Sequence, residues 1–200
     1  MTLRRLCVFC GSSTGRDPAF VDAARGLGVL LAEQGIGLVY GGTSIGLMSV
    51  IADAALESGG EVIGVIPQAL IDREIAHNGL KDLQIVTSMH ERKARMGELS
   101  DGFVALPGGL GTLEEAAEVL TWAQLRIHIK PCGFLNVAGF FDPLLVMFDH
   151  AVEEGFLSAE HRAMIVVEDN AKALVERFRS YTAPADKWGR TDKSAREIPT

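Results

Sequence analysis

The nine consecutive residues at 107–115, Pro-Gly-Gly-Leu-Gly-Thr-Leu-Glu-Glu, have the clearest chemical potential in the chain. The apolar run 103–106 before them predicts a buried parallel strand, and apolar residues at helical spacing follow. The glycines therefore lie where a strand ends and a helix begins, where free backbone N–H groups can bind a ligand. Glycine has no Cβ to keep the backbone away from a phosphate. The segment predicts a phosphate-binding turn, with the carboxylates of Glu114 and Glu115 one turn beyond it.

Glu115 also has a purely structural interpretation. Thr112 and Glu115 have the S/T-x-x-E spacing of a capping box, in which Thr112 would cap the helix and Glu115 would accept from the Thr112 N–H. In the same way, Glu114 is either a stabiliser of the first helical turn or a ligand. The local sequence leaves these alternatives open.

A second group of charged residues, at 88–96, follows another predicted strand and opens another helix. Arg92 and Lys93 are adjacent cations at the helix start, where the helix dipole disfavours positive charge. That cost favours a partner anion, either a phosphate or a carboxylate. The alternative is a solvated helix face on which Glu91 and Arg95 form an i,i+4 pair.

Short apolar strands alternate with helical patterns along the chain, which predicts an α/β fold: a doubly wound, Rossmann-like parallel sheet of about seven strands flanked by helices. We expect a single nucleotide-binding domain over residues 1–181 and a polar, flexible C-terminal tail at 182–200. The predicted strands are 6–9, 37–40, 62–66, 83–86, 103–106, 133–136 and 164–167. The predicted helices are 18–34, 45–58, 91–100, 113–127, 141–154 and 171–181.

Glycines follow three of the predicted strands, at Gly11, at Gly41-Gly42 and, after Pro107, at Gly108-Gly109. Each turn taken alone is an ordinary strand-to-helix connection. The carboxyl ends of parallel strands share one edge of the sheet, however, and ligands bind in the crevice there. The three turns together therefore predict a single binding site.

The net charge of −7 argues against a nucleic acid or an anionic membrane as partner, since both require a basic surface. It leaves a phosphorylated small molecule open, because a local group of donors is enough to bind one. The five histidines have no metal-ligand spacing, and we expect neither a metal nor a cofactor.

The chain has three cysteines, Cys7, Cys10 and Cys132. Such a small and odd number argues against a disulfide framework and favours a reducing compartment. Cys7 and Cys10 would point to opposite faces of a strand, so we do not expect a redox or metal pair. The N-terminus has no signal-peptide core, and no stretch is long and apolar enough to span a bilayer. These features predict a cytoplasmic protein.

Three motifs together resemble one known family. They are Pro-Gly-Gly-x-Gly-Thr-x-x-Glu at 107–115, Met-His-x-Arg-Lys at 89–93 and Gly-Gly-x-x-x-Gly-Leu-Met at 41–48. The resemblance, which runs from about residue 6 to about residue 173, is to the LONELY GUY (LOG) family of cytokinin riboside 5′-monophosphate phosphoribohydrolases. That family has often been labelled "possible lysine decarboxylase". No lysine of this chain has the recognisable setting of a Schiff-base lysine, so the sequence does not support that label.

The resemblance implies hydrolysis of the N-glycosidic bond of a purine riboside 5′-monophosphate, in a homodimer whose subunits complete each other's sites. The base would be adenine or an N6-substituted adenine, and the other product ribose 5-phosphate. By position, Arg92 and Glu115 match the catalytic pair. The positions that match substrate or phosphate contacts are Gly11, Ser12, Gly41, Gly42, Glu74, Met89, Lys93, Gly108, Gly109, Leu110, Gly111, Thr112, Leu113, Glu114 and Thr121.

The chain departs from the family pattern at two positions. Thr43 and Ser49 stand where the family usually has glycine. If position 43 required a positive φ, Thr43 would be strained and the fit of a ligand there would suffer.

Two other functions compete with hydrolysis. A protein that binds or senses AMP-type nucleotides without turnover would need only the glycines, whereas the presence of both Arg92 and Glu115 favours an enzyme. A nicotinamide-dependent dehydrogenase is disfavoured because the turn at 11–15 is not GxGxxG.

The predicted helix at 113–127 has more apolar surface than packing on one face of a sheet requires, with Trp122, Leu125 and Ile127 near its end. This excess of apolar surface also favours a dimer.

Overall fold

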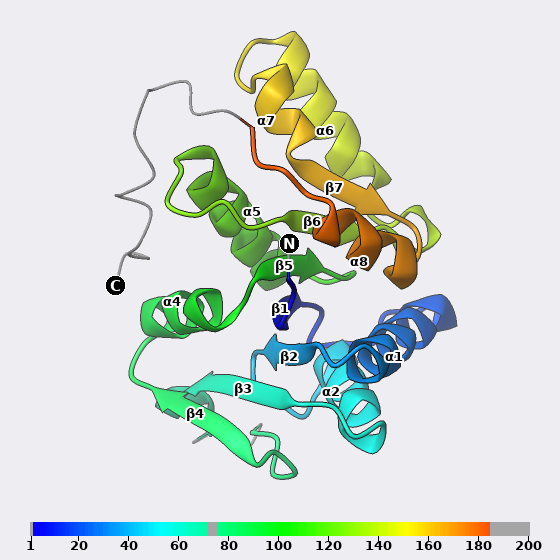
Figure 1. The fold of residues 1–200 in the computed structure, drawn as a ribbon, viewed down its shortest axis with the longest axis vertical. Coiled ribbons are helices and arrows are strands. Elements are labelled where there is room, and N and C mark those ends of the chain that lie inside the picture. The colour runs from blue at the N-terminus through cyan, green and yellow to red at the C-terminus, as the bar shows by residue number, and fades with distance from the viewer. Residues whose placement is uncertain (1, 72–75, 185–200) are drawn as a thin grey trace.

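The computed structural model describes residues 2–71 and 76–184 (Figure 1). Its strands form one parallel sheet in the order β4-β3-β2-β1-β5-β6-β7, which confirms the predicted Rossmann-like α/β fold. The chain builds the sheet outward from β1 to β4 and then crosses back to β5, so the topological switch point lies between β1 and β5. The strands are β1 (Arg5–Phe9), β2 (Gly37–Tyr40), β3 (Val62–Pro67), β4 (Asp82–Val86), β5 (Gly102–Ala105), β6 (Cys132–Leu135) and β7 (Ile165–Glu168).

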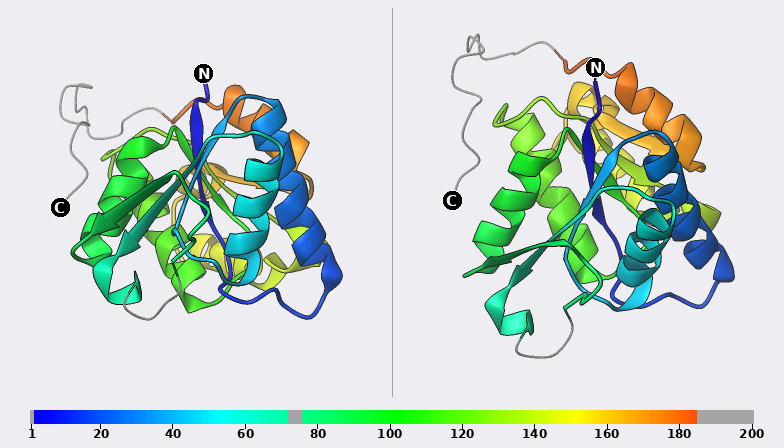
Figure 2. Two further views of the ribbon diagram at one scale, coloured as in Figure 1. Left: turned by 90° about the horizontal axis from the view of Figure 1, so that it is seen from below. Right: turned by 60° about the horizontal axis from the view of Figure 1, so that its bottom comes forward.

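Helices cover both faces of this sheet (Figure 2). Residues of α1, α2 and α8 join one apolar core, while residues of α4, α5 and α6 pack against the opposite face. The longer helices are α1 (Pro18–Glu33), α2 (Gly46–Glu57), α4 (Met89–Leu99), α5 (Leu110–Gln124), α6 (Asp142–Glu153) and α8 (Ala171–Arg179). The shorter ones are α3 (Gln68–Ile71), the 3-10 turn η1 (Val137–Gly139) and α7 (Ala159–Ala163).

Strand β1 shows how the alternation of side chains fills both cores. Leu6 and Val8 belong to the core under α1 and α2, whereas Cys7 and Phe9 belong to the core under α4 and α5. Cys10 lies on the opposite side from Cys7, as predicted, and all three cysteines are free and buried. The strand is therefore buried on both faces, as the central strand of a parallel sheet must be.

The short elements were not predicted from the sequence. Helices α3 and α7 have four and five residues, which is too short for a helical period to be visible. Helix α4 begins at Met89 because the Ser88 hydroxyl accepts from the Glu91 N–H, a cap that places the start two residues before the predicted one.

The division of the chain into a domain at 1–181 and a tail at 182–200 stays a prediction. Residues 72–75 and 185–200 lie outside the described residues, so Glu74 and most of the predicted tail cannot be placed. Within the described residues, no helix has the length and apolar character needed to cross a membrane.

Candidate active site

The three glycine turns meet at the carboxyl edge of the sheet, on the switch point. The Gly11 N–H donates to the Pro107 carbonyl at 3.0 Å, and a Cβ on Gly11 would lie only 3.3 Å from the Gly108 Cα. The Leu47 N–H donates to the Gly11 carbonyl at 3.0 Å, so the turn after β2 joins the same edge. The sequence prediction that these turns lie together is therefore correct.

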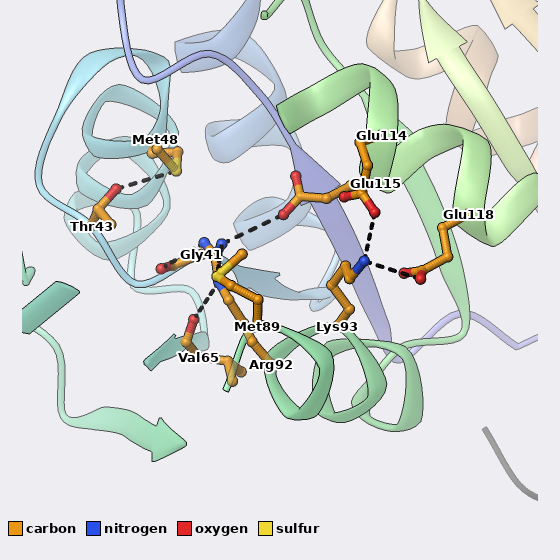
Figure 3. A network of polar contacts seen from close by, with 10 residues as sticks. All are labelled: Gly41, Thr43, Met48, Val65, Met89, Arg92, Lys93, Glu114, Glu115 and Glu118. Carbon is orange, nitrogen blue, oxygen red and sulfur yellow. Dashed lines mark hydrogen bonds and ion pairs between the residues drawn. The ribbon is translucent and has the colours of Figure 1, made fainter. Parts of the chain in front are cut away.

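Arg92 reaches from α4 beneath this edge and is almost fully buried (Figure 3). Its Nε donates to the Val65 carbonyl at 3.0 Å, and its Nη2 donates to the Gly41 carbonyl at 3.0 Å. A Cβ at Gly41 would collide with Nη2, so Gly41 must be glycine to admit the guanidinium. A carbonyl within β3 and a carbonyl directly after β2 therefore fix the position of Arg92.

Glu115 faces Arg92 from α5, with its Oε1 3.6 Å from the Arg92 Nη1 and its side chain 13% exposed. Burial raises the pKa of Glu115 to about 6, although the positive charge of Arg92 lowers it. The carboxylate thus lies close to a fixed cation but outside hydrogen-bonding distance, which leaves it available to a substrate.

The capping-box interpretation of Glu115 is wrong. Helix α5 begins at Leu110, and its N-cap is Gly109, which makes no side-chain cap bond. Thr112 therefore lies inside the helix and is not its N-cap residue. A capping box requires Glu115 to accept from the N–H of the N-cap residue, so Thr112 and Glu115 do not form one. The helix starts earlier than predicted because Gly109 takes an extended conformation, φ −93° and ψ −155°, directly before it.

Lys93 is held by two carboxylates of α5 (Figure 3). Its Nζ lies 2.6 Å from Glu114 Oε1 and 3.0 Å from Glu118 Oε1, and its side chain is 10% exposed. Burial alone would lower the pKa of Lys93, but the hydrogen bonds to both carboxylates bring the pKa above its ordinary value. Arg92 and Lys93 therefore both meet carboxylates of one helix.

The alternative of a solvated face on α4 is also wrong. Glu91 accepts from the Thr87 N–H and hydroxyl, each at 2.7 Å, and does not pair with Arg95. Arg95 instead donates to Gln84 and pairs with Glu98 at 3.0 Å. These partners lie on β4, in the turn after it and on α4 itself, and the i,i+4 pair that the sequence suggested does not form.

The glycines of the phosphate-type turn have different roles. A Cβ at Gly108 would collide with the Thr112 hydroxyl, so packing requires glycine there. Gly109 and Gly111 have no neighbour within 4 Å of an added Cβ, and neither has a positive φ. The fold itself does not require glycine at these two positions, which leaves the surface above them open to a ligand.

Other predicted positions are scattered. The Met89 sulfur lies 4.0 Å from Arg92 Nη1, and Ser12 and Leu110 lie exposed on the carboxyl edge. Leu113 packs instead against the core beside β6. Thr121, seven residues beyond Glu114, is exposed and donates to the Ala117 carbonyl at 2.7 Å.

The departures from the family pattern cause no strain. The positive φ in this turn belongs to Gly42, at 71°, and not to Thr43. The buried Thr43 hydroxyl donates to the Met48 sulfur at 3.2 Å, and the Ser49 hydroxyl donates to the Gly46 carbonyl at 3.1 Å.

Sequence reasoning missed Glu118 as a site residue. It lies four residues after Glu114, on the same face of α5, and this spacing would have predicted that both reach one cation.

Two of the histidines, His77 and His128, contact other residues of the fold. His77 Nε2 lies 3.0 Å from Asp53 Oδ1, and His128 is buried beside Phe103, where burial lowers its pKa to about 4. Over residues 2–71 and 76–184, no group of three or more His, Cys, Asp or Glu side chains is arranged to hold a metal ion.

Fold and site together define a Rossmann-like α/β protein with an arginine–glutamate pair beside a glycine-rich turn at the switch point. Solved structures of other proteins share this fold. The molybdenum cofactor binding protein of Rippkaea orientalis has a TM-score of 0.68 at 22% identity, covering 90% of this chain and 98% of that one. The molybdenum cofactor carrier protein of Chlamydomonas reinhardtii has a TM-score of 0.65 at 20% identity, covering 90% and 100%. At such identities the likeness shows the fold alone.

Sequence relatives are much closer. A family model described as "Possible lysine decarboxylase" matches residues 48–178. The cytokinin riboside 5′-monophosphate phosphoribohydrolase LOG of Oryza sativa subsp. japonica is 51% identical over 178 residues, 89% of this chain and 74% of the relative. LOG1 of Arabidopsis thaliana, which bears the same enzyme name, is 51% identical over 184 residues, 92% of this chain and 86% of the relative. The chain belongs to the LOG family of cytokinin riboside 5′-monophosphate phosphoribohydrolases.

Proposed function

We propose that this protein hydrolyses the N-glycosidic bond of purine riboside 5′-monophosphates and releases ribose 5-phosphate and the free base. The base is adenine or an N6-substituted adenine. The observation that carries the proposal is the buried Arg92–Glu115 pair, 3.6 Å apart, beside the open turn at 108–111. The enzyme names of the relatives, at about half identity, support the same activity.

The pair suits this chemistry. Breaking a ribosyl C–N bond places positive charge on the sugar, and a nearby carboxylate stabilises that charge. Glu115 has this role and also accepts a proton from the attacking water, whose oxygen bonds to C1′. The electron pair of the broken bond leaves with the purine, and a ring nitrogen of the purine takes up a proton. Arg92 favours the ionised form of Glu115, in which the carboxylate can act.

The glycine turn supplies the other requirement, which is binding of the 5′-phosphate. Gly109 and Gly111 leave the backbone at the start of α5 open, and N–H groups at a helix start bind anions. Binding energy from the phosphate holds the ribose in place while the reaction occurs at C1′. No step of this scheme uses a metal or a cofactor.

The first experiment measures base release. AMP and isopentenyladenosine 5′-monophosphate are incubated separately with wild-type protein, with Glu115→Gln and with Glu98→Gln, and the free base is quantified by chromatography. We expect release by wild type and by Glu98→Gln, which alters an exposed ion pair at the far end of α4. Loss of release in a folded Glu115→Gln protein supports catalysis. Binding of both nucleotides without release from either would favour the alternative, a nucleotide-binding or sensing protein.

The proposed assembly is a homodimer formed through α5 and α6. No residue of α6 is buried, although Val146 and Met147 are apolar and 67% and 59% exposed. A hollow of about 230 Å³ lies between α5, α6 and α7, and exposed Thr121 lines it. A second copy on this face would cover the apolar surface and bring Thr121 toward the partner's site.

The proposed location is the cytoplasm. The three buried cysteines are free, which supports work in a reducing compartment.

A further inference from the structure

The ammonium of Lys93 lies between two carboxylates whose surroundings differ (Figure 3). Glu114 and Glu118 come from adjacent turns of α5 and lie 2.6 Å and 3.0 Å from Lys93 Nζ. The Glu114 side chain is 55% exposed, but that of Glu118 is 25% exposed. Of all described residues, Glu118 is one of three with a fully buried side-chain oxygen or nitrogen that lacks a hydrogen-bond partner.

The charges of the site raise a difficulty for an anionic substrate. The two cations, Arg92 and Lys93, face three carboxylates, those of Glu114, Glu115 and Glu118. A phosphate at the start of α5 would lie about one turn from Glu114 and add further negative charge. The positive charge of Lys93 attracts that phosphate more strongly if one of the two carboxylates moves away from the ammonium.

The two carboxylates would not leave equally easily. Water hydrates the exposed Glu114 carboxylate, so its ion pair is weak and its release costs little. One oxygen of Glu118, Oε2, is already buried without a hydrogen-bond partner. Release from Lys93 would take the partner of Oε1 as well, which costs far more. An ammonium has three N–H donors, so Lys93 can keep its bond to Glu118 while it exchanges its other partner.

We propose that Glu118 is a positioning residue that holds Lys93 at the site, and that Glu114 is the exchangeable partner whose place on Lys93 the substrate phosphate takes. This inference rests on the proposed function for the identity of the anion. It assigns opposite effects to two carboxylates on one face of the same helix. Removal of the charge of Glu118 weakens phosphate binding, because Lys93 loses its anchor. Removal of the charge of Glu114 strengthens it, because a competitor is lost.

The experiment compares Glu118→Gln, Glu114→Gln and the control Glu98→Gln in two measurements. Calorimetry gives the Kd of ribose 5-phosphate, and base release gives KM and kcat for AMP. We expect Glu118→Gln to raise Kd and KM by about tenfold and Glu114→Gln to lower both by about threefold. Glu98→Gln should change neither. In a Lys93→Met background, Glu118→Gln should have no further effect on Kd, because its role acts through Lys93.

The outcomes separate the inference from the proposed function. Weakening of ribose 5-phosphate binding by Glu114→Gln, or an undiminished effect of Glu118→Gln without Lys93, overturns the inference. Glu114 is exposed, so Glu114→Gln tests the proposal even if Glu118→Gln does not fold. If wild type releases no base from either nucleotide, the proposed activity fails. The Kd values for ribose 5-phosphate then still decide whether Glu118 and Glu114 act in opposite ways.

Discussion

At the scale of single residues, burial of the ionised Glu115 carboxylate lowers the stability of the folded protein, although the proposed reaction needs that carboxylate. Its pKa of about 6 lies above the ordinary value of 4.5 because burial disfavours the charged form. The folded protein therefore binds the proton more tightly than the unfolded chain. Below pH 4.5 Glu115 is neutral in both the folded and the unfolded protein, so it does not affect stability. As the pH rises from 4.5 through 6, the carboxylate ionises more readily in the unfolded chain, and the free energy of unfolding falls.

We predict that Glu115→Gln makes the protein more stable at pH 7.5. The shift corresponds to about 2 kcal/mol, which the neutral amide avoids. Thermal unfolding at pH 7.5 and at pH 4 checks this, because the gain should vanish at the lower pH. An equal or lower Tm at pH 7.5 would show that the pair with Arg92 outweighs the burial cost.

The same pKa predicts an acidic limb in the activity. Base release requires the Glu115 carboxylate in its ionised form, so kcat/KM should fall by about tenfold for each pH unit below about 6. A rate profile between pH 4.5 and pH 8 measures this limb. A profile that stays level down to pH 4.5 would mean that ionised Glu115 is not required.

Gly111 offers a prediction in which stability and binding change in opposite directions. It lies in the first turn of α5, has an ordinary φ and has open space at the Cβ position, so Gly111→Ala should stabilise the protein by about 0.5–1 kcal/mol. The added methyl group should nevertheless weaken ribose 5-phosphate binding. Gly26→Ala in α1, also a helical position with open space, is the control that should gain stability alone. Unchanged Kd in Gly111→Ala would place the phosphate elsewhere.

At the scale of elements, the site depends on how the turn after β2 is fixed. The His77 N–H donates to the Gly42 carbonyl at 3.0 Å, and the His77 ring bonds to Asp53 of α2 and accepts from the Gly79 N–H at 3.2 Å. These bonds attach the segment before β4 to the turn whose Gly41 carbonyl holds Arg92.

We predict that His77→Ala lowers stability by about 1–3 kcal/mol and raises KM, because Asp53 and Gly79 lose their partner and the turn loses support. Chemical unfolding and base release measure the two effects. Arg25→Ala, on the exposed face of α1 and away from α6, is the control and should leave both unchanged. A loss of stability with an unaltered KM would limit His77 to a structural role.

At the scale of the whole molecule, we expect a dimer mass at micromolar concentration by size-exclusion chromatography with light scattering. Val146→Glu would place a charge on the apolar face of α6 and should yield a monomer. Arg25→Glu, on α1 at the opposite face of the sheet, should remain dimeric. A wild-type monomer would contradict the proposed assembly, and so would a dimer that Val146→Glu leaves intact.

Local patterns allowed much of the fold to be predicted. Short apolar runs predicted every strand, because strands buried on both faces are apolar throughout, and a period of 3.6 predicted the long helices, because each buries one face. The helix starts were less accurate, since caps such as Ser88 and Gly109 depend on a single residue. The meeting of the glycine turns also followed, because parallel strands end at one edge.

The sequence by itself determined the sheet, its glycine-bearing edge and the residues with chemical potential, because these depend on period and on short motifs. Only the tertiary structure decided which charges meet. The packing of α4 against α5 pairs Arg92 with Glu115 and Lys93 with Glu118, whereas Thr121 lines the hollow between α5, α6 and α7. Burial, and with it the raised pKa of Glu115, likewise depends on neighbours distant in sequence. Local sequence patterns contain no information about such distances.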